Sequence, residues 1–288
     1  MNKLATSGCE TIVPSGERKP LKEIERSIIT KYRYPVWSQF TKAIRDYQLI
    51  KEGDRVAVAI SGGKDSLLMA KLFQELERHG KVKFEAKFIA MDPGYHPKVK
   101  ELLLSNSEYL HIPLIIYESS IFDIVDNIAN DYPCYMCAKM RRGSLYAKAL
   151  ELGCNKLALG HHFNDVIETT LLNLLCAGSF KTMMPKLKSK NFPGLELIRP
   201  MYYIHEESIE KFIRESGISP MNCACMVAAK KTGSKRYEIK NLIKEIKPTF
   251  QQVEKSIFRA AHNVQLDCII GWKEHGKSYF FLEEYDEE

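Results

Sequence analysis

The chain has 288 residues, of which 45% are hydrophobic and 27% are charged, so it is long enough and apolar enough to bury a large globular core. No apolar run approaches the roughly 20 residues that a membrane-spanning helix needs, and residues 1–9 lack the apolar segment of a signal peptide. These features exclude a membrane-embedded protein, and we expect a cytoplasmic one.

The charge is unevenly distributed along the chain. The formal net charge is +6, although five of the last six residues are acidic; without those five negative charges the rest of the chain carries +11. A basic body favours a polyanionic partner larger than a nucleotide, and simple solubility is the alternative explanation. Eight cysteines in a cytoplasmic chain argue against a disulfide framework and for a metal or redox site.

The first fifty residues predict an arm followed by two helices. Residues 1–20 mix glycines and prolines with polar residues, which indicates a loosely ordered arm. Apolar residues recur at helical spacing from Leu21 to Ile50, and Pro35 interrupts the pattern, so we expect one helix on either side of it.

A glycine-rich segment joins the first predicted strand, Arg55–Ile60, to a helix that is expected to end at about His79. The two glycines permit positive φ angles and close approach to a ligand, and the helix start directs free N–H groups at the same place. The lysine adds a positive charge and the serines add hydroxyl donors. We therefore predict a phosphate-binding loop, with an ordinary strand-to-helix turn as the alternative. Its residues are Ser61, Gly62, Gly63, Lys64, Asp65 and Ser66.

The spacing within this loop excludes two common phosphate-binding motifs. A Walker A loop needs a glycine where this chain has Val58, and a serine or threonine where it has Asp65. The G-x-G spacing of a dinucleotide-binding loop is also absent. The segment instead resembles the PP-loop of the ATP pyrophosphatases, which hold the β- and γ-phosphates of ATP, react at the α-phosphate and release pyrophosphate.

Strands and helices alternate through the centre of the chain. We expect further strands over 84–91, 112–117 and 156–159, and helices over 97–110, 137–152 and 164–175. This alternation predicts an α/β fold with a doubly wound parallel sheet covered by helices on both faces. Ligands of such sheets bind beyond the carboxyl ends of the strands, so the phosphate loop, the turn at Asp92 and the turn at 160–165 should share one edge.

The pattern is looser beyond residue 180. We expect a lysine-rich loop over 181–190, a last strand over 195–203, and helices over 206–216, 237–246 and 249–263. The chain is accordingly divided into an N-terminal arm with helices (1–50), an ATP pyrophosphatase domain (51–205) and a C-terminal helical region (206–288).

The turn at 160–165 has the residues of a second nucleotide-contacting element. Gly160 permits close approach to a nucleotide, His161 lies beside it, and Asp165 can orient Mg²⁺ or act as a base. Adjacent histidines point apart, which argues against a metal held by both His161 and His162. The alternative is a helix cap formed by Asn164 or Asp165 without chemistry.

Two pairs of cysteines are closely spaced. Cys134 and Cys137 begin a predicted helix, with Arg141 one turn on, and both the helix start and the arginine favour thiolates. The second pair is Cys223 and Cys225. A zinc site on all four, a thioredoxin-like redox pair and an iron–sulfur cluster on three cysteines remain open. Other cysteines are expected to be small core residues, namely Cys154, Cys176 and Cys268.

Basic residues gather at 141–142, 181–190 and 230–236. Such runs are usually solvated surface, but beside a site that consumes ATP they favour a phosphate-rich substrate.

The order of these motifs resembles the tRNA 2-thiocytidine synthetase family of PP-loop ATP pyrophosphatases. The likeness covers about residues 35–245, including Leu-Ala-Leu-Gly-His-His at 157–162, Met-Met-Pro-Lys-Leu at 183–187 and Ile-Arg-Pro at 198–200. In that family ATP adenylates the C2 oxygen of a cytidine at position 32 of tRNA, and sulfur then displaces AMP with the help of a [4Fe–4S] cluster on three cysteines. The resemblance implies tRNA thiolation here, with ATP, Mg²⁺ and such a cluster as cofactors.

Carried over residue by residue, the resemblance implies a role for each motif residue. Catalysis falls to Asp65, Asp165 and Arg141, and cluster ligation to Cys134, Cys137 and Cys223. Nucleotide binding falls to Ser61, Gly62, Gly63, Lys64, Asp65, Ser66, Gly160 and His161. The implied partners are tRNA, a sulfur donor (a cysteine desulfurase or free sulfide) and a second copy in a homodimer, with no membrane.

The chain departs from the family pattern at two places. Asn222 stands where a proline usually precedes the late cysteine and Cys225 comes early, so the third ligand is Cys223 or Cys225. Asn164 stands where an acid is usual, which leaves Asp165 alone. The alternative functions are modification of another tRNA base, by 2-thiouridine formation or lysidine synthesis, and a non-catalytic nucleotide-binding module held together by zinc. Lysidine synthesis needs no sulfur, so the cysteine pair argues against it.

Overall fold

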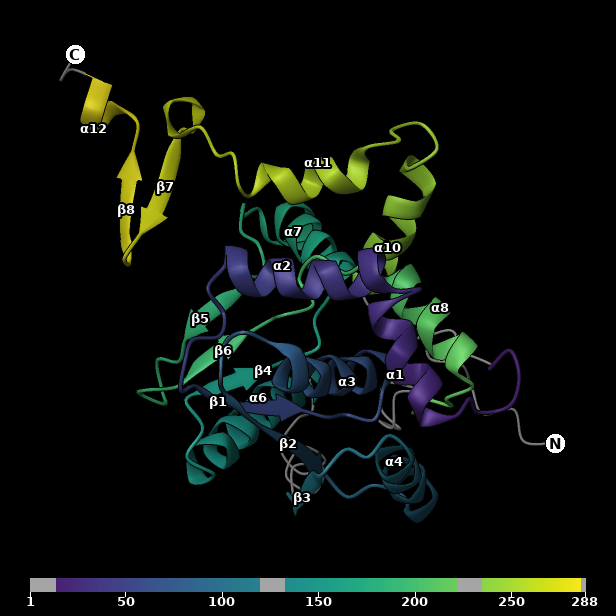
Figure 1. The fold of residues 1–288 in the computed structure, drawn as a ribbon. Helices are drawn as coiled ribbons and strands as arrows, with labels where there is room; N and C mark the ends of the chain where they lie inside the picture. The colour runs from purple at the N-terminus through teal and green to yellow at the C-terminus, as the bar shows by residue number, and fades with distance from the viewer. Residues whose placement is uncertain (1–13, 120–132, 222–234, 286–288) are drawn as a thin grey trace.

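The computed structural model describes residues 14–119, 133–221 and 235–285, and within them it confirms the predicted α/β fold. A six-stranded sheet has the order β3-β2-β1-β4-β6-β5, in which the edge strand β5 runs antiparallel to β6 and all other neighbouring strands are parallel. Helices cover both of its faces (Figure 1). The strands are β1 (Arg55–Ala59), β2 (Glu85–Asp92), β3 (Leu114–Glu118), β4 (Lys156–Ala158), β5 (Lys186–Lys188) and β6 (Glu196–Ile198).

The central strands are buried on both faces. Val56, Ala57 and Val58 of β1 are consecutive and fully buried, as expected of a parallel strand between two layers of helices. Val56 and Val58 pack with the helices of one face, whereas Ala57 belongs to the core of the other. The sheet therefore sits at the centre of the hydrophobic core, and its carboxyl edge is left for the loops.

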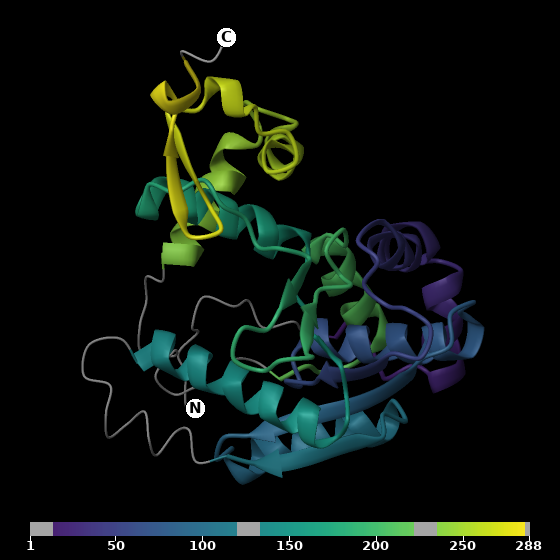
Figure 2. The same cartoon turned by 90° about the vertical axis from the view of Figure 1, so that its left-hand side faces the viewer.

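One face of the sheet carries five helices that share a single hydrophobic cluster. These are α1 (Leu21–Ile29), α2 (Ser38–Asp46), α3 (Lys64–His79), α4 (Pro97–Tyr109) and α8 (Glu206–Ser216). Pro35 lies in a π-helical turn, Arg33–Trp37, between α1 and α2, where the sequence predicted an interruption. The opposite face is covered by α6 (Pro133–Glu151), which runs along the sheet in Figure 2.

The C-terminal part of the chain packs on α7 (Phe163–Ala177) rather than on the sheet. Phe163 and Ile167 of α7 form a small core with Ile239 and Ile243 of α10 (Lys235–Ile246), and α11 (Val253–Ala260) lies beside them. A 3₁₀ turn (Leu266–Cys268) then leads to the hairpin of β7 (Gly271–Glu274) and β8 (Lys277–Phe280) and to α12 (Leu282–Tyr285). The hairpin stands apart from the sheet in Figure 1. Among the helices that the structure describes, none combines the length and apolarity needed to cross a bilayer.

Several sequence predictions were wrong at the ends of the sheet. Residues 186–188 form β5 rather than a loop, because a lysine-rich edge strand lacks the apolar pattern of an inner strand. The last strand ends at Ile198 instead of extending to residue 203, two residues before Pro200. The β7–β8 hairpin was not predicted, although His275 and Gly276 both have positive φ angles, as a tight hairpin turn requires.

Residues 14–20 are not the loose arm that composition suggested. The backbone N–H of Ser15 donates to the carbonyl of Arg214 (3.1 Å), and that of Lys19 donates to the carbonyl of Ser216 (3.1 Å), at the C-terminal end of α8. Gly217 closes α8 with φ of 71°, and a side chain there would collide with the backbone of Glu17. The proposed division of the chain at residues 50 and 205 stays a prediction. In the structure, α1, α2 and α8 share one hydrophobic cluster with the sheet.

A fully buried lysine joins α1, α3 and the end of α4. The ammonium group of Lys71 donates to Glu25 Oε1 (2.6 Å), Gln74 Oε1 (2.6 Å) and the carbonyl of Leu110 (3.1 Å). Burial lowers the pKa of Lys71, and the hydrogen bond with Glu25 opposes that shift. All three N–H donors of the Lys71 ammonium group are used, so its burial is tolerated. These bonds fix α1 to α3 and to the end of α4.

We predict that Lys71→Ala lowers the free energy of unfolding by about 3 kcal/mol, because buried acceptors lose their donor and a cavity remains. Denaturant unfolding followed by circular dichroism measures the change, with Lys22→Ala on the exposed side of α1 as the control. Equal midpoints for the two variants would show that the buried network does not stabilise the fold.

Candidate functional site

The loop between β1 and α3 has the backbone shape of an anion cradle. Gly62 has φ of +77°, and a Cβ there would lie 2.1 Å from Met221 Sδ, so only glycine fits. The carbonyl of Gly62 accepts a hydrogen bond from the N–H of Met221 (2.8 Å). Gly63 differs from our expectation, since it is extended (φ −74°, ψ 164°) and serves as the N-cap of α3. The positive φ is therefore needed at Gly62 alone.

The two serines close the loop on itself. Ser66 Oγ donates to the carbonyl of Gly63 (3.0 Å) and accepts from the N–H and the hydroxyl of Ser61 (both 3.2 Å). Ser61 Oγ in turn accepts from the N–H of Gly63 at 3.4 Å. These bonds hold the loop in shape before any ligand arrives, and the N-terminal N–H groups of α3 begin directly after it.

Lys64 lies in a balanced set of charges. Its ammonium group is 3.3 Å from Asp65 Oδ1 and 3.2 Å from Glu206 Oε1, at the start of α8. Glu206 also accepts from Lys240 of α10 at 2.6 Å. Burial would lower the pKa of Lys64, but Asp65 and Glu206 raise it overall. Burial likewise opposes the ionised form of Glu206, yet the two lysines bring the pKa of Glu206 down to about 2.

The turn after β4 packs directly against the phosphate loop. A Cβ on Gly160 would lie 3.4 Å from the carbonyl carbon of Asp65, so the glycine permits this close approach. Asp165 Oδ2 accepts from the backbone N–H of His162 (2.9 Å), and this bond caps α7. The helix cap that was the alternative to a chemical role is therefore present. Asp165 Oδ1 pairs with Arg236 of α10 at 2.8 Å. The same arginine donates to Glu168 (3.0 Å).

These contacts keep Asp165 ionised. Burial alone would raise the pKa of Asp165, but His162, Arg236 and His161 lower it to about 2. A carboxylate with so low a pKa is a weak proton acceptor at neutral pH. Of the two roles predicted from sequence, attraction of a cation therefore suits Asp165 better than general-base catalysis.

His162 connects the two acids. Its Nε2 lies 3.8 Å from Asp65 Oδ1 and 3.5 Å from Asp165 Oδ2, and only 4% of its surface is exposed. In the described part of the chain, Asp65 Oδ1 is buried without a hydrogen-bond partner. Asp65 Oδ1 lies 3.3 Å from the ammonium group of Lys64 without a hydrogen bond to it. A buried carboxylate oxygen that accepts no hydrogen bond beside a phosphate loop fits a Mg²⁺ ion, which prefers oxygen ligands and commonly combines one or two carboxylates with substrate phosphates.

His161 contacts the end of β6 rather than the acids. Its Nδ1 accepts from Arg199 Nε at 3.2 Å. Burial lowers the pKa of His161 to about 4, so the ring is neutral at physiological pH. A neutral ring that accepts at Nδ1 carries its proton on Nε2, which is available as a donor.

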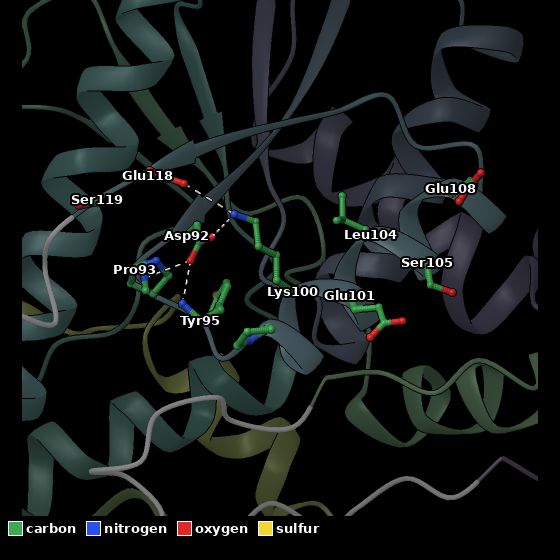
Figure 3. Close-up of a pocket in the computed structure, with 12 residues that line it drawn as sticks. Asp92, Pro93, Tyr95, Lys100, Glu101, Leu104, Ser105, Glu108, Glu118 and Ser119 are labelled. Carbon is green, nitrogen blue, oxygen red and sulfur yellow. Dashed lines mark hydrogen bonds and ion pairs between the residues drawn. The ribbon is translucent and has the colours of Figure 1, made fainter.

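The turn after β2 forms the side of an open polar pocket (Figure 3). Asp92 Oδ1 accepts from the N–H groups of Gly94 (3.0 Å) and Tyr95 (2.8 Å), and its Oδ2 pairs with Lys100 at 2.8 Å. Burial would raise the pKa of Asp92, but Lys100 and the two N–H groups lower it overall. Asp92 thus shapes the turn, and the turn lies at the carboxyl edge as predicted.

The structure tests only some of the predictions made for the cysteines. Cys134 and Cys137 lie in the first two turns of α6, three residues apart on one side of the helix, while Cys223 and Cys225 fall outside the described residues. Cys154 is buried as predicted, but Cys176 and Cys268 are exposed, so their prediction as core residues was wrong. The described part of the chain holds no group of three potential metal ligands.

Topology accounts for which predicted residues meet. The strand order reverses between β1 and β4, and the phosphate loop and the 160–165 turn follow these two strands, so both lie at the switch point where ligands of such sheets bind. The N-terminal end of α6 lies at the same carboxyl edge, because α6 follows β3 and crosses over to the parallel β4. Burial raises the pKa of Tyr117 in β3, and the hydrogen bond with Ser144 and the charge of the half-buried Arg141 oppose that shift.

Five residues of this site were not predicted as functional: His162, Arg199, Glu206, Arg236 and Lys240. Arg236 stood in a basic cluster and Arg199 in the Ile-Arg-Pro run, so both were visible as motif members without a partner. Glu206 carried no sequence signal beyond beginning a helix, because its contact with Lys64 spans 142 residues of sequence.

Comparison with known proteins agrees with this geometry. The PP-loop domain model matches residues 34–222. The chain is 36% identical to a tRNA-cytidine(32) 2-sulfurtransferase of Geobacter metallireducens over 78% of this chain and 87% of the relative. It is 38% identical to the enzyme of that name from Citrifermentans bemidjiense over 77% and 88%.

A solved structure shares the fold. It is the U34-tRNA thiolase NcsA from Methanococcus maripaludis with its [4Fe–4S] cluster, at a TM-score of 0.64 and 20% identity, with 91% of both chains covered. The solved structure shows the fold, whereas the sequence matches, at 36% and 38% identity over most of the chain and of each relative, show the family. The chain therefore belongs to the PP-loop family and, within it, to the family of the tRNA-cytidine(32) 2-sulfurtransferases.

Proposed function

We propose that this protein is an ATP-dependent tRNA sulfurtransferase that converts a cytidine, at position 32, to 2-thiocytidine. The observation that carries the proposal is the meeting of Lys64, Asp65 and Asp165 at the switch point of the sheet, in a chain of this family. ATP would be held by the phosphate loop, and the cytidine C2 oxygen would bond to the α-phosphorus as pyrophosphate leaves. Sulfur would then bond to C2 as the C2–oxygen bond breaks and AMP departs.

The residues around the loop divide the work of binding ATP. The N–H groups at the start of α3 and the ammonium group of Lys64 would hold the phosphates, with Ser61 and Ser66 keeping the loop closed. Asp65 and Asp165 would face Mg²⁺, which neutralises the charge that builds up on pyrophosphate. Gly62, Gly63, Gly160 and His161 would line the nucleotide site, with Gly62 packed against Met221 and Gly160 against Asp65.

The cysteine-bearing segments would reach the same edge. Cys134 and Cys137 begin α6 at the carboxyl edge of the sheet, and Cys223 follows two residues after Met221, which is hydrogen-bonded to Gly62. Three thiolates fit a [4Fe–4S] cluster with one iron left open, and such a cluster can bind an incoming sulfur atom. Arg141, one turn further along α6, would attract negative charge near the thiolates.

The partners follow from this chemistry. A cytidine in an RNA loop is unstacked at low cost, so it can enter the cleft, and exposed lysines near β5 (Lys181, Lys188 and Lys190) would contact phosphates. Sulfur would come from a cysteine desulfurase or from free sulfide. We further propose that the protein is cytoplasmic, where tRNA is found, and that it forms a homodimer.

The proposal as a whole is tested by reconstitution under anaerobic conditions. Protein, an unmodified tRNA transcript, ATP, Mg²⁺ and sulfide should yield 2-thiocytidine, identified by mass spectrometry of the nucleosides, together with AMP and pyrophosphate. Formation of 2-thiouridine would support the alternative function, in which the modified base is a uridine. A colourless, zinc-containing protein without product would support the non-catalytic module.

For the phosphate loop, we predict that Asp65→Ala lowers the rate of AMP formation by about 100-fold or more, because an anionic ligand of the Mg²⁺ ion that would bind the phosphates is lost. Circular dichroism should show an unchanged fold. Asp46→Ala, on α2 and away from the loop, is the matched control. Normal turnover of Asp65→Ala would refute the assignment of the loop.

For α10, we predict that Arg236→Met lowers the turnover number by roughly tenfold while changing the KM for ATP much less, because Asp165 loses the partner that orients it. The neighbouring Lys235→Met, whose side chain is 70% exposed, should retain full activity. A larger effect on KM than on turnover would assign Arg236 to nucleotide binding instead.

For the cluster, we predict that Cys137→Ser loses iron and labile sulfide but still binds ATP, since the phosphate loop does not depend on the cluster. Iron analysis of anaerobically purified protein and ATP calorimetry measure the two properties. Cys176→Ser, an exposed thiol on α7, should keep its iron. Full iron content in Cys137→Ser would show that the ligand set is different.

A further inference from the structure

Arg199 is a buried cation at the carboxyl edge of the sheet. It follows β6 directly, only 4% of its surface is exposed, and its backbone N–H donates to the carbonyl of Pro185 at 2.9 Å. The neighbouring strand β4 leads into the 160–165 turn, so Arg199 lies one strand beyond the switch point. The phosphate loop and its acids do not use it.

The guanidinium group is held by neutral acceptors. Its Nε donates to His161 Nδ1 at 3.2 Å, and its Nη1 donates to the carbonyl of Met184. No carboxylate of the described residues forms an ion pair with it. Asp165 is close enough to attract the charge, but its two oxygens are already taken by Arg236 and by the N–H of His162.

A second cation makes the position more positive. Arg142 of α6 is near enough that its charge, after the effect of burial, helps to lower the pKa of Arg199 to about 10. Arg142 is itself exposed, whereas Arg199 is buried, and a buried cation beside another positive charge and without a carboxylate partner is costly to keep. A protein retains such an arrangement where an anionic ligand completes it, and arginine is suited to phosphate because its fork of N–H groups binds two oxygens at once.

Arg199 lies between the residues proposed to bind ATP and the helix α6, which carries two of the proposed cluster ligands. On one side, His161 joins Gly160, which touches Asp65 of the phosphate loop. On the other side is α6, which carries Arg142 and, at its start, Cys134 and Cys137. An anion at Arg199 would thus be part of whatever molecule passes between ATP and the cysteines.

We propose that Arg199, assisted by Arg142, binds a phosphate group of a substrate, either a phosphodiester of the RNA beside the reacting cytidine or the α-phosphate of ATP. This inference rests on the proposed function. His161 Nδ1 and the carbonyl of Met184 hold the guanidinium in position through its Nε and Nη1. The competing explanation is a structural one, in which Arg199 only fixes the chain at Met184.

The test measures both possible sources of phosphate with the full chain. Dissociation constants are obtained for Mg·ATP by calorimetry and for an unmodified tRNA transcript by filter binding at several salt concentrations. Wild type is compared with Arg199→Gln and Arg199→Lys. Arg55→Gln is the control, because Arg55 is exposed at the amino end of β1, on the opposite edge of the sheet. Thermal melting of every variant reports on folding.

We expect Arg199→Gln to weaken one of the two ligands by about tenfold or more and to leave the other unchanged, with Arg199→Lys intermediate. If the RNA supplies the phosphate, the slope of log affinity against log salt should also fall by about one. If ATP supplies the phosphate, only the dissociation constant for Mg·ATP should change.

Two results would overturn the inference. If Arg199→Gln binds both ligands with wild-type affinity, Arg199 does not bind a phosphate group, and the proposed function is unaffected. Parallel weakening of both ligands, with a lower melting temperature, would assign a structural role. Failure of the wild-type protein itself to bind ATP or tRNA would instead refute the proposed function, and this inference with it.

Discussion

The site depends on the close approach of two strand-to-helix turns at the boundary between β1 and β4. The approach is possible because Gly160 has no side chain where it meets Asp65 and the start of α3. Two helix starts and their acids are thereby brought within a few ångströms, and a single buried histidine touches both Asp65 and Asp165. A Cβ at position 160 would lie 3.4 to 3.5 Å from Asp65 and Ser66, which is ordinary van der Waals contact, so the two turns already pack closely there.

This concentration of acids is stabilised from outside the sheet. Asp165 and Glu168 on α7 pair with Arg236, and Glu206 on α8 pairs with Lys240, so that α10 supplies two cations to carboxylates borne by two other helices. Burial opposes the ionised form of each acid, and the pairs overcome that opposition at Asp165 and Glu206, whose pKa values fall to about 2. Helix α10 therefore contributes cations to the proposed nucleotide site in addition to its packing on α7.

The same charges hold the proposed phosphate loop in shape. Lys64 is paired with Glu206 and Asp65, so its ammonium group is already held at the loop before phosphate arrives. The serine bonds fix the backbone in the same way. A loop that is ordered in advance loses little conformational entropy on binding, which leaves more of the interaction energy for the ligand.

Sequence reasoning succeeded where a local pattern carries the information. The phosphate loop, α3 and α8 were predicted closely, because buried strands, helical periodicity and paired glycines are read over a few residues. It missed β5 and the β7–β8 hairpin, whose short strands lack a clear apolar pattern. It also missed the partners of the acids, because the Arg236–Asp165 pair spans 71 residues and only the packing of α10 on α7 brings its members together.

The bond between Met221 and Gly62 gives this arrangement a further consequence. Gly62 needs its positive φ so that its carbonyl can face the N–H of Met221, and Met221 lies over the space where a side chain would stand. Within the described residues, the N–H of Met221 thus joins the phosphate loop to the chain just before Cys223. On the far side of that segment, Arg236 returns to Asp165. Both ends of the late-cysteine segment are thus tied to the ATP site, so a shift of the loop on binding nucleotide would act on the two ends together.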